Sequence, residues 1–187
     1  MIKVLRQKDW SDPVRPYPRE VRSALPVDPK RPPLLFVGRS AEFFAGHWLD
    51  RAAERGWAAY ALTPRPGRFV PLREHCHDVV QVAASLPRQA VLIGHGPGAR
   101  AVASALTRYP ARAAVLISPP LRLPAEEVVG PGQVLVVGAP GRALTKAGEH
   151  YGVSGTLLSD PRRLSDPAWL DPLEGVLDWL ESTLPPE

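Results

Sequence analysis

Val91-Leu92-Ile93-Gly94-His95-Gly96-Pro97-Gly98-Ala99-Arg100 is the stretch that decides the order of structural elements in this chain. Its first three residues form a continuous apolar run, which is typical of a strand buried on both faces of a parallel sheet. Glycines at three alternate positions then predict a sharp turn. Pro97 suits the first position of a helix, where a missing backbone N–H costs nothing. The stretch therefore predicts a buried strand, a glycine turn and a helix that runs to about Tyr109.

The same kind of alternation extends along the chain from about Pro33 onward. Apolar runs are followed by amphipathic stretches, and this order favours βαβ units around a parallel sheet. We therefore predict an α/β fold, with a mostly parallel sheet flanked by helices on both faces. The strands are expected at residues 34–37, 57–62, 90–93, 113–117, 133–137 and 156–158, and the helices at 40–55, 71–86, 97–109, 144–151 and from 171 onward.

Several ends of the predicted helices are inferred from individual residues. Ser40 is expected to cap the first helix and Gly56 to end it, while Asp171 has the pattern of a cap for the last helix. The segment 1–30 is rich in proline and arginine. Within it, residues 2–5 and 19–25 are expected as antiparallel edge strands, because proline confines a strand to an edge. Length and composition fit one domain over residues 1–187.

The distribution of charge indicates which classes of binding partner the chain is expected to lack. Lys and Arg number 23 against 19 Asp and Glu, which gives a net charge of +4. The basic residues occur singly, whereas nucleic acid and anionic membranes require a clustered basic footprint. The sequence also lacks the run of about 18 apolar residues that spans a bilayer, and its first residues do not form a signal peptide. We therefore expect neither a nucleic acid nor a membrane as partner.

Residue usage indicates the compartment and the source. Cys76 is the only cysteine, so nothing points to an oxidising compartment and we expect a cytoplasmic protein. Asparagine is absent, arginine outnumbers lysine and there are 23 prolines. These counts are typical of a thermophilic bacterial protein with few thermolabile residues and stiffened loops. A GC-rich genome would produce the same counts.

The glycine turn and one later stretch together resemble a known family. The later stretch is Tyr109-Pro110-Ala111-Arg112-Ala113-Ala114-Val115-Leu116-Ile117-Ser118-Pro119. With residues 91–99 it is similar to the α/β-hydrolase family, whose turn usually has the pattern G-H-S-x-G, and the resemblance extends from about Arg19 onward. Only about fifteen residues, 118–132, separate the next two strands. The resemblance therefore implies a compact member without a cap domain.

The resemblance also implies three catalytic positions, in the order nucleophile, acid, histidine. The nucleophile position falls on Gly96, which offers neither a hydroxyl nor a thiol. The acid position, three residues beyond Gly138, falls on Gly141. The histidine is expected around Pro161, and no histidine follows His150. We therefore predict a pseudoenzyme that lacks the Ser-acid-His triad and acts by binding.

A residual cleft is predicted at the edge of the sheet, lined by Gly38, Arg39, Ser40, His95, Gly96 and Pro97. Backbone N–H groups beside Gly38 could hold an anion or a carbonyl without turnover, and Arg39 would add positive charge. The alternative is that Gly38 only makes a tight turn and Arg39 is solvated. The expected partner is a small ligand or another protein, which the fold alone does not identify.

Two other functions fit parts of the sequence. The first is an atypical hydrolase that uses a displaced nucleophile, with Ser40, Cys76 and His95 as candidates. The second is nucleotide binding, because residues 94–99 satisfy the G-x-G-x-x-A fingerprint between a strand and a helix. That fingerprint also expects a carboxylate at the end of the next strand, where this chain has Ser118.

The triplet His75-Cys76-His77 suggests a metal site or a reactive thiol. Residues two apart on a helix point away from each other, so the two histidines cannot both bind one ion. No second cluster of ligands accompanies them. Cys76 is therefore expected to be a small buried apolar residue. We expect no metal and no cofactor.

Overall fold

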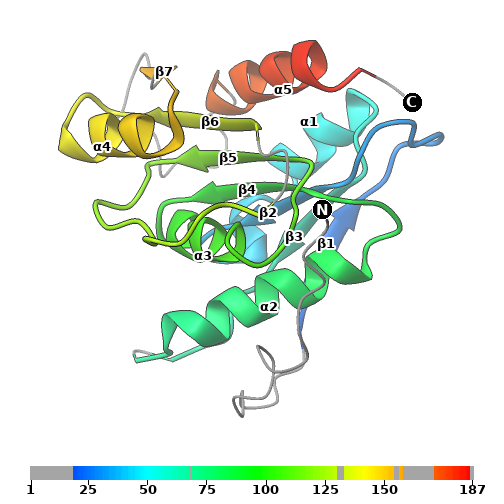
Figure 1. Cartoon of the computed structure of the whole chain (residues 1–187). Coiled ribbons are helices and arrows are strands. Elements are labelled where there is room, and N and C mark those ends of the chain that lie inside the picture. The colour runs from blue at the N-terminus through cyan, green and yellow to red at the C-terminus, as the bar shows by residue number, and fades with distance from the viewer. Residues whose placement is uncertain (1–18, 68, 130–132, 154–155, 158–170, 186–187) are drawn as a thin grey trace.

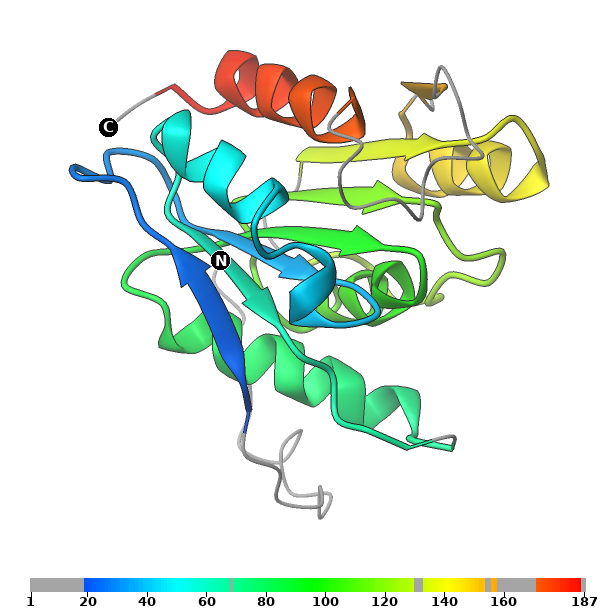
Figure 2. The ribbon, with the colours of Figure 1, turned by 180° about the vertical axis from the view of Figure 1, so that it is seen from behind.

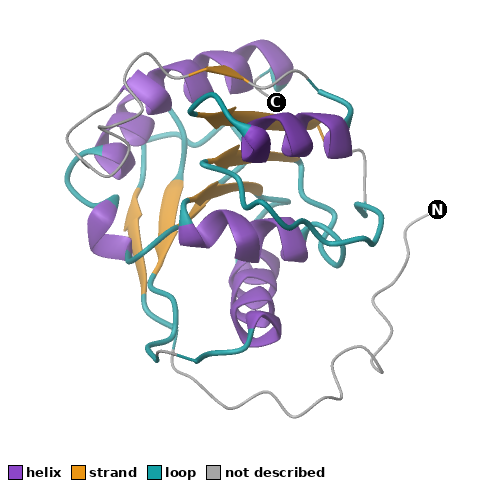
Figure 3. Ribbon diagram, turned by 90° about the vertical axis from the view of Figure 1, so that its left-hand side faces the viewer, coloured by secondary structure: helices purple, strands orange, loops and turns teal. Residues whose placement is uncertain are grey.

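The apolar runs of the sequence become the strands of one sheet. The computed structural model describes residues 19–67, 69–129, 133–153, 156–157 and 171–185 (Figure 1). Within them a sheet of seven strands has helices on both faces, as Figure 3 shows. Its strands are β1 Val21–Ala24, β2 Leu34–Val37, β3 Ala59–Leu62, β4 Val91–His95, β5 Ala113–Ile117, β6 Gln133–Gly138 and β7 Thr156–Leu157.

The strand order is β1-β3-β2-β4-β5-β6-β7. All neighbouring pairs are parallel except β1 with β3, so β1 is the antiparallel edge strand expected within residues 19–25. The strand expected at residues 2–5 lies outside the described residues. The order reverses between β2 and β4, and their carboxyl ends flank the crevice where open α/β sheets bind ligands. The predicted fold class is confirmed.

The helices divide between the two faces of the sheet. Helices α1 (Trp48–Glu54) and α5 (Asp171–Thr183) cover one face, and in Figure 2 α1 lies in front of the sheet with α5 at the top. Helices α2 (Leu72–Ser85), α3 (Pro97–Ala105) and α4 (Arg142–Tyr151) cover the other. None of the described helices is long and apolar enough to cross a membrane.

Both faces of the central strands are buried. In β4, Leu92 packs with α2 and α3, while Val91 and Ile93 pack toward α1 and α5. In β5 every residue is inaccessible to solvent. Burial on two faces explains why these strands are continuously apolar and do not alternate between apolar and polar residues.

The helix expected over residues 40–55 is interrupted. Ser40 does act as a cap, since its Oγ accepts the Phe43 N–H at 3.3 Å, but the element it caps is a short 3-10 helix, η2 (Ala41–Phe43). Gly46 then has φ +77°, in the left-handed region, which a right-handed helix does not permit. Helix α1 therefore begins only at Trp48. Gly56, at φ +83°, lies just beyond its end as expected.

An ion-pair cluster joins α1 to α5 across a long stretch of sequence. Arg55 contacts Glu174, Asp178 and Glu181 at 2.8–2.9 Å. Arg51 contacts the same Glu174 at 2.5 Å, and its hydrogen bond lowers the pKa of that carboxyl group below its ordinary value. The cluster holds the last helix against α1 at the edge of the apolar core.

Helix α3 lies so close to the sheet that only glycine fits at two positions. A Cβ at Gly98 would lie 2.0 Å from the carbonyl oxygen of Val37 in β2. A Cβ at Gly94 would lie 2.5 Å from the Cα of Ala99. Because both obstacles are backbone atoms, no rotamer change could relieve the overlap.

We therefore expect Gly98→Ala to lower the free energy of unfolding by about 3 kcal/mol or more, the upper end of the cost of overpacking. Gly175→Ala is the matched control, since a Cβ there meets no atom within 4 Å and the position lies inside α5. That variant is expected to raise stability by up to about 1 kcal/mol through helix propensity. Denaturant unfolding followed by tryptophan fluorescence measures both. A Gly98→Ala protein as stable as the wild type would contradict the close approach.

Candidate functional site

The turn between β4 and α3 has the backbone form of a nucleophile elbow. Gly96 adopts φ +54° and ψ −116°, and its N–H donates to the Ile117 carbonyl at 2.9 Å. A Cβ at this position would meet no atom of the described residues within 4 Å. Gly96 therefore differs from Gly94 and Gly98, because its conformation favours glycine but the surrounding space would admit a side chain.

The residues that follow the neighbouring strands lie along the same carboxyl edge. Ser118, directly after β5, has φ +54°, which is strained for a residue with a Cβ. Its N–H donates to the Val137 carbonyl at 2.8 Å. Gly141 is exposed between β6 and α4, with φ +156°. The third position, Pro161, lies outside the described residues. Gly96, Ser118 and Gly141 therefore follow β4, β5 and β6 along this edge.

Pro97 carries a consequence that the sequence analysis missed. In this type of site one oxyanion-hole donor is the backbone N–H of the residue after the nucleophile. Pro97 occupies that position as the first residue of α3, and proline has no N–H. The signal was present in the sequence, but there it was interpreted only as the start of a helix.

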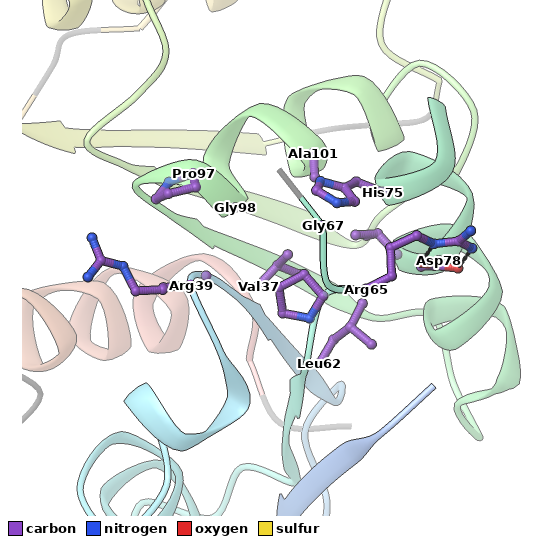
Figure 4. Close-up of a pocket in the computed structure, with 13 residues that line it drawn as sticks. Val37, Arg39, Leu62, Arg65, Gly67, His75, Asp78, Pro97, Gly98 and Ala101 are labelled. Atoms are coloured by element: carbon purple, nitrogen blue, oxygen red, sulfur yellow. Dashed lines mark hydrogen bonds and ion pairs between the residues drawn. The ribbon is translucent and has the colours of Figure 1, made fainter. Parts of the chain in front are cut away.

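The segment after β2 makes a tight turn. A Cβ at Gly38 would lie 2.7 Å from the Phe44 ring, so this buried glycine lets the aromatic ring approach. Arg39 is exposed, and Figure 4 shows its side chain extending away from His75 and Asp78.

Each of the three candidates for a displaced nucleophile has a structural role. Ser40 caps η2, as described above. His95 is 7% exposed and packs against the rings of Phe43 and Trp48, with centroid distances of 4.7 and 5.8 Å. Cys76 is buried in α2, as expected, and this burial raises the pKa of its thiol to about 11. Each group is thus engaged in packing or capping.

A cavity of about 220 Å³ opens beside the elbow, between α2 and α3 at the carboxyl ends of β2 and β3 (Figure 4). Three residues of the predicted cleft, Gly38, Arg39 and Pro97, line it. The other three, Ser40, His95 and Gly96, do not.

A buried ion pair forms part of the cavity wall. Both carboxylate oxygens of Asp78 accept hydrogen bonds from Arg65, each at 2.6 Å, and the two side chains are 1% and 4% exposed. Glu74 contacts Arg65 at 2.7 Å and Arg19 contacts Asp78 at 3.1 Å. The Asp78 hydrogen bonds raise the pKa of Arg65, which remains charged. The sequence analysis missed this cluster, because no motif links residues 19, 65 and 78.

The two histidines of α2 have different surroundings. His75 lies on the cavity wall, whereas Nδ1 of His77 accepts a hydrogen bond from Arg19 at 3.2 Å. Burial and the nearby Arg19 cation lower the pKa of His77. Within the described part of the chain, no three His, Cys, Asp or Glu side chains gather as a metal site would require.

Comparison with proteins of known structure identifies the fold. Neither a family model nor a curated protein matches the sequence. A putative aryl esterase from Burkholderia cenocepacia has a similar structure, with a TM-score of 0.67 at 12% identity over 88% of this chain and 94% of that one. A serine hydrolase without a lid from Xanthomonas campestris gives 0.62 at 21% identity, over 90% and 91%. Naproxen esterase from Bacillus subtilis gives 0.60 at 14% identity, over 87% of each chain.

These likenesses show the fold: the chain has the α/β-hydrolase fold. The described residues between β5 and β6, 118–129, contain no helix, in agreement with the expected compact form without a cap. The resemblance inferred from the two sequence stretches is confirmed at this level.

The Arg65–Asp78 pair is expected to contribute strongly to stability. Asp78→Ala leaves a buried cation without its principal partner and should lower the free energy of unfolding by about 3–5 kcal/mol. Glu42→Ala is the control, because it removes a partner of Arg22 from an exposed ion pair and should cost less than about 1 kcal/mol. Urea unfolding measures both. Equal costs would contradict the importance of the buried pair.

The environment of Cys76 predicts a thiol that does not react in the folded protein. With a pKa of about 11, only about one thiol in a thousand is ionised near pH 8, against about a quarter for an ordinary cysteine. A disulfide reagent such as DTNB should therefore react at least about a hundredfold more slowly with the folded protein than in guanidinium chloride. Equal rates would restore Cys76 as a candidate nucleophile.

Proposed function

We propose that this chain is a non-catalytic α/β-hydrolase-fold protein that acts by binding a ligand or a protein partner. The observation that carries the proposal is Gly96 at the nucleophile elbow. The turn, the strand before it and the helix after it are retained, but the side chain that would attack a substrate is missing.

Three further positions support the same function. Pro97 removes one oxyanion-hole donor, so a tetrahedral intermediate would lose part of its stabilisation. Gly141 stands where the resemblance implies the acid. No histidine follows His150 in the sequence, and His150 belongs to α4, before β7. A protein that had lost only its nucleophile would be expected to keep the base and the acid.

The other two functions have weaker support. A displaced nucleophile needs a base and access to substrate, whereas Ser40 caps a helix, Cys76 is buried and His95 packs among aromatic rings. A dinucleotide site needs a carboxylate after β5 for the ribose, and Ser118 stands there. We also propose that the chain works as one domain in the cytoplasm of a thermophilic bacterium, as its composition indicates.

The proposal predicts that the purified chain neither hydrolyses activated p-nitrophenyl esters nor becomes labelled by a fluorophosphonate. Intact-mass spectrometry detects labelling, and an active serine hydrolase serves as the positive control. Covalent labelling that maps to a defined residue, such as Ser118 beside the elbow, would overturn the proposal.

The proposal also predicts that Gly96→Ser does not create an efficient hydrolase. The space at the elbow admits the side chain, but a serine without a base remains a weak nucleophile. Ester hydrolysis should stay within about tenfold of the wild-type background, far below the effect of a complete triad. Gly96→Ser combined with Pro97→Ala, which restores the N–H, should remain equally inactive. Triad-like rates in either variant would show that a base and an acid are present elsewhere.

A further inference from the structure

The cavity beside the elbow has mainly apolar walls. Val37 and Leu62 come from the ends of β2 and β3, Val79 from α2 and Ala101 from α3. All four are at most 3% exposed. The cavity lies at the carboxyl edge of the sheet, where the strand order reverses and open α/β sheets bind ligands.

The buried charges in the wall are already neutralised. Arg65 is held by Asp78 through two hydrogen bonds and by Glu74 through a third. Arg39 lines only the rim, and its side chain extends away from His75 and Asp78 in Figure 4. A charged ligand would lose its hydration without gaining a free counter-charge from the buried part of this wall, which is costly in apolar surroundings. The cavity therefore favours a neutral occupant.

One polar atom of a residue that lines the cavity has its hydrogen-bonding capacity unmet. His75 lines the cavity beside Ala101 (Figure 4). Its Nε2 is buried and has no hydrogen-bond partner among the described residues. A neutral imidazole nitrogen either donates or accepts one hydrogen bond, and a hydroxyl group can serve as the partner in both cases.

We propose that this cavity binds a compact neutral ring that carries one hydroxyl group, with the hydroxyl at Nε2 of His75. The size agrees, since an apolar cavity of about 150 Å³ holds benzene, and about 220 Å³ leaves room for one substituent. The inference rests on the proposed function, because a chain that acts by binding needs a ligand site. Phenol and cyclohexanol share this chemistry and represent aromatic and aliphatic sources.

The test is an NMR titration of the full ¹⁵N-labelled chain with phenol, cyclohexanol, toluene and benzoate in turn. At least one of the two alcohols should give saturable shifts at the amides of Gly67, Val79 and Ala101, and the tighter one identifies the source. Toluene should bind more weakly, because it leaves His75 unpaired. Benzoate should not bind at these amides.

Variants of His75 separate the hydrogen bond from the apolar contact. His75→Phe keeps a ring but removes Nε2, and should weaken the binding of the preferred alcohol about tenfold, the effect of one hydrogen bond, with toluene unchanged. His75→Gln retains a polar group and should restore part of the affinity. Ala101→Leu should fill the cavity and weaken all the neutral ligands together, and thermal unfolding checks that each variant is folded.

Two results would overturn the inference. The first is an absence of saturable shifts with both alcohols, and the second is equal affinity of His75→Phe and the wild type for the alcohol that binds. Neither result bears on the proposed loss of catalysis, which is decided by ester turnover and fluorophosphonate labelling. Conversely, turnover would overturn the proposed function whether or not an alcohol occupies the cavity.

Discussion

The close approach of α3 to the sheet is the constraint on which the rest of the structure depends. Because Gly98 has no side chain, the start of the helix packs directly against the Val37 carbonyl. Gly94 likewise allows β4 to contact the backbone of Ala99. This contact sets the sharpness of the turn and places Gly96 at the carboxyl edge beside β5. It also forms one side of the cavity, since Pro97, Gly98 and Ala101 line it.

The constraint explains how the architecture can persist without a side chain at the elbow. Gly94 and Gly98 are required by packing, whereas a Cβ at position 96 would meet no atom of the described residues within 4 Å. A serine at φ +54° would be strained by about 1–3 kcal/mol, and glycine removes that strain. Once a hydroxyl is not needed, glycine at the elbow therefore stabilises the same fold.

Charged side chains organise the parts of the molecule that the apolar core does not define. Arg55 holds α5 against α1, and Arg65 joins the loop after β3 to α2 through Asp78. The first cluster lies at the rim of the core and the second is buried. The pair also leaves the buried part of the cavity wall electrically balanced, which links the stability of this loop to the kind of ligand that the cavity favours.

Sequence periodicity determined the fold class, the order of the elements and the bounds of β2 and β5. Long apolar runs buried on two faces have one interpretation, and glycine and proline mark their ends. The glycines at positions 96 and 141 were also visible in the sequence, because residue type does not depend on the tertiary structure.

Only the tertiary structure decided how the carboxyl edge is arranged. The sequence predicted one cleft from six residues, but only three of them line the cavity, and the others pack or shape the turn. The Arg65–Asp78 pair arises from contacts between separate elements, as does the position of His75, whose Nε2 has no partner among the described residues. Such contacts leave no periodic signal, because hydrophobic patterns report which side of an element is buried and not which side chains meet there.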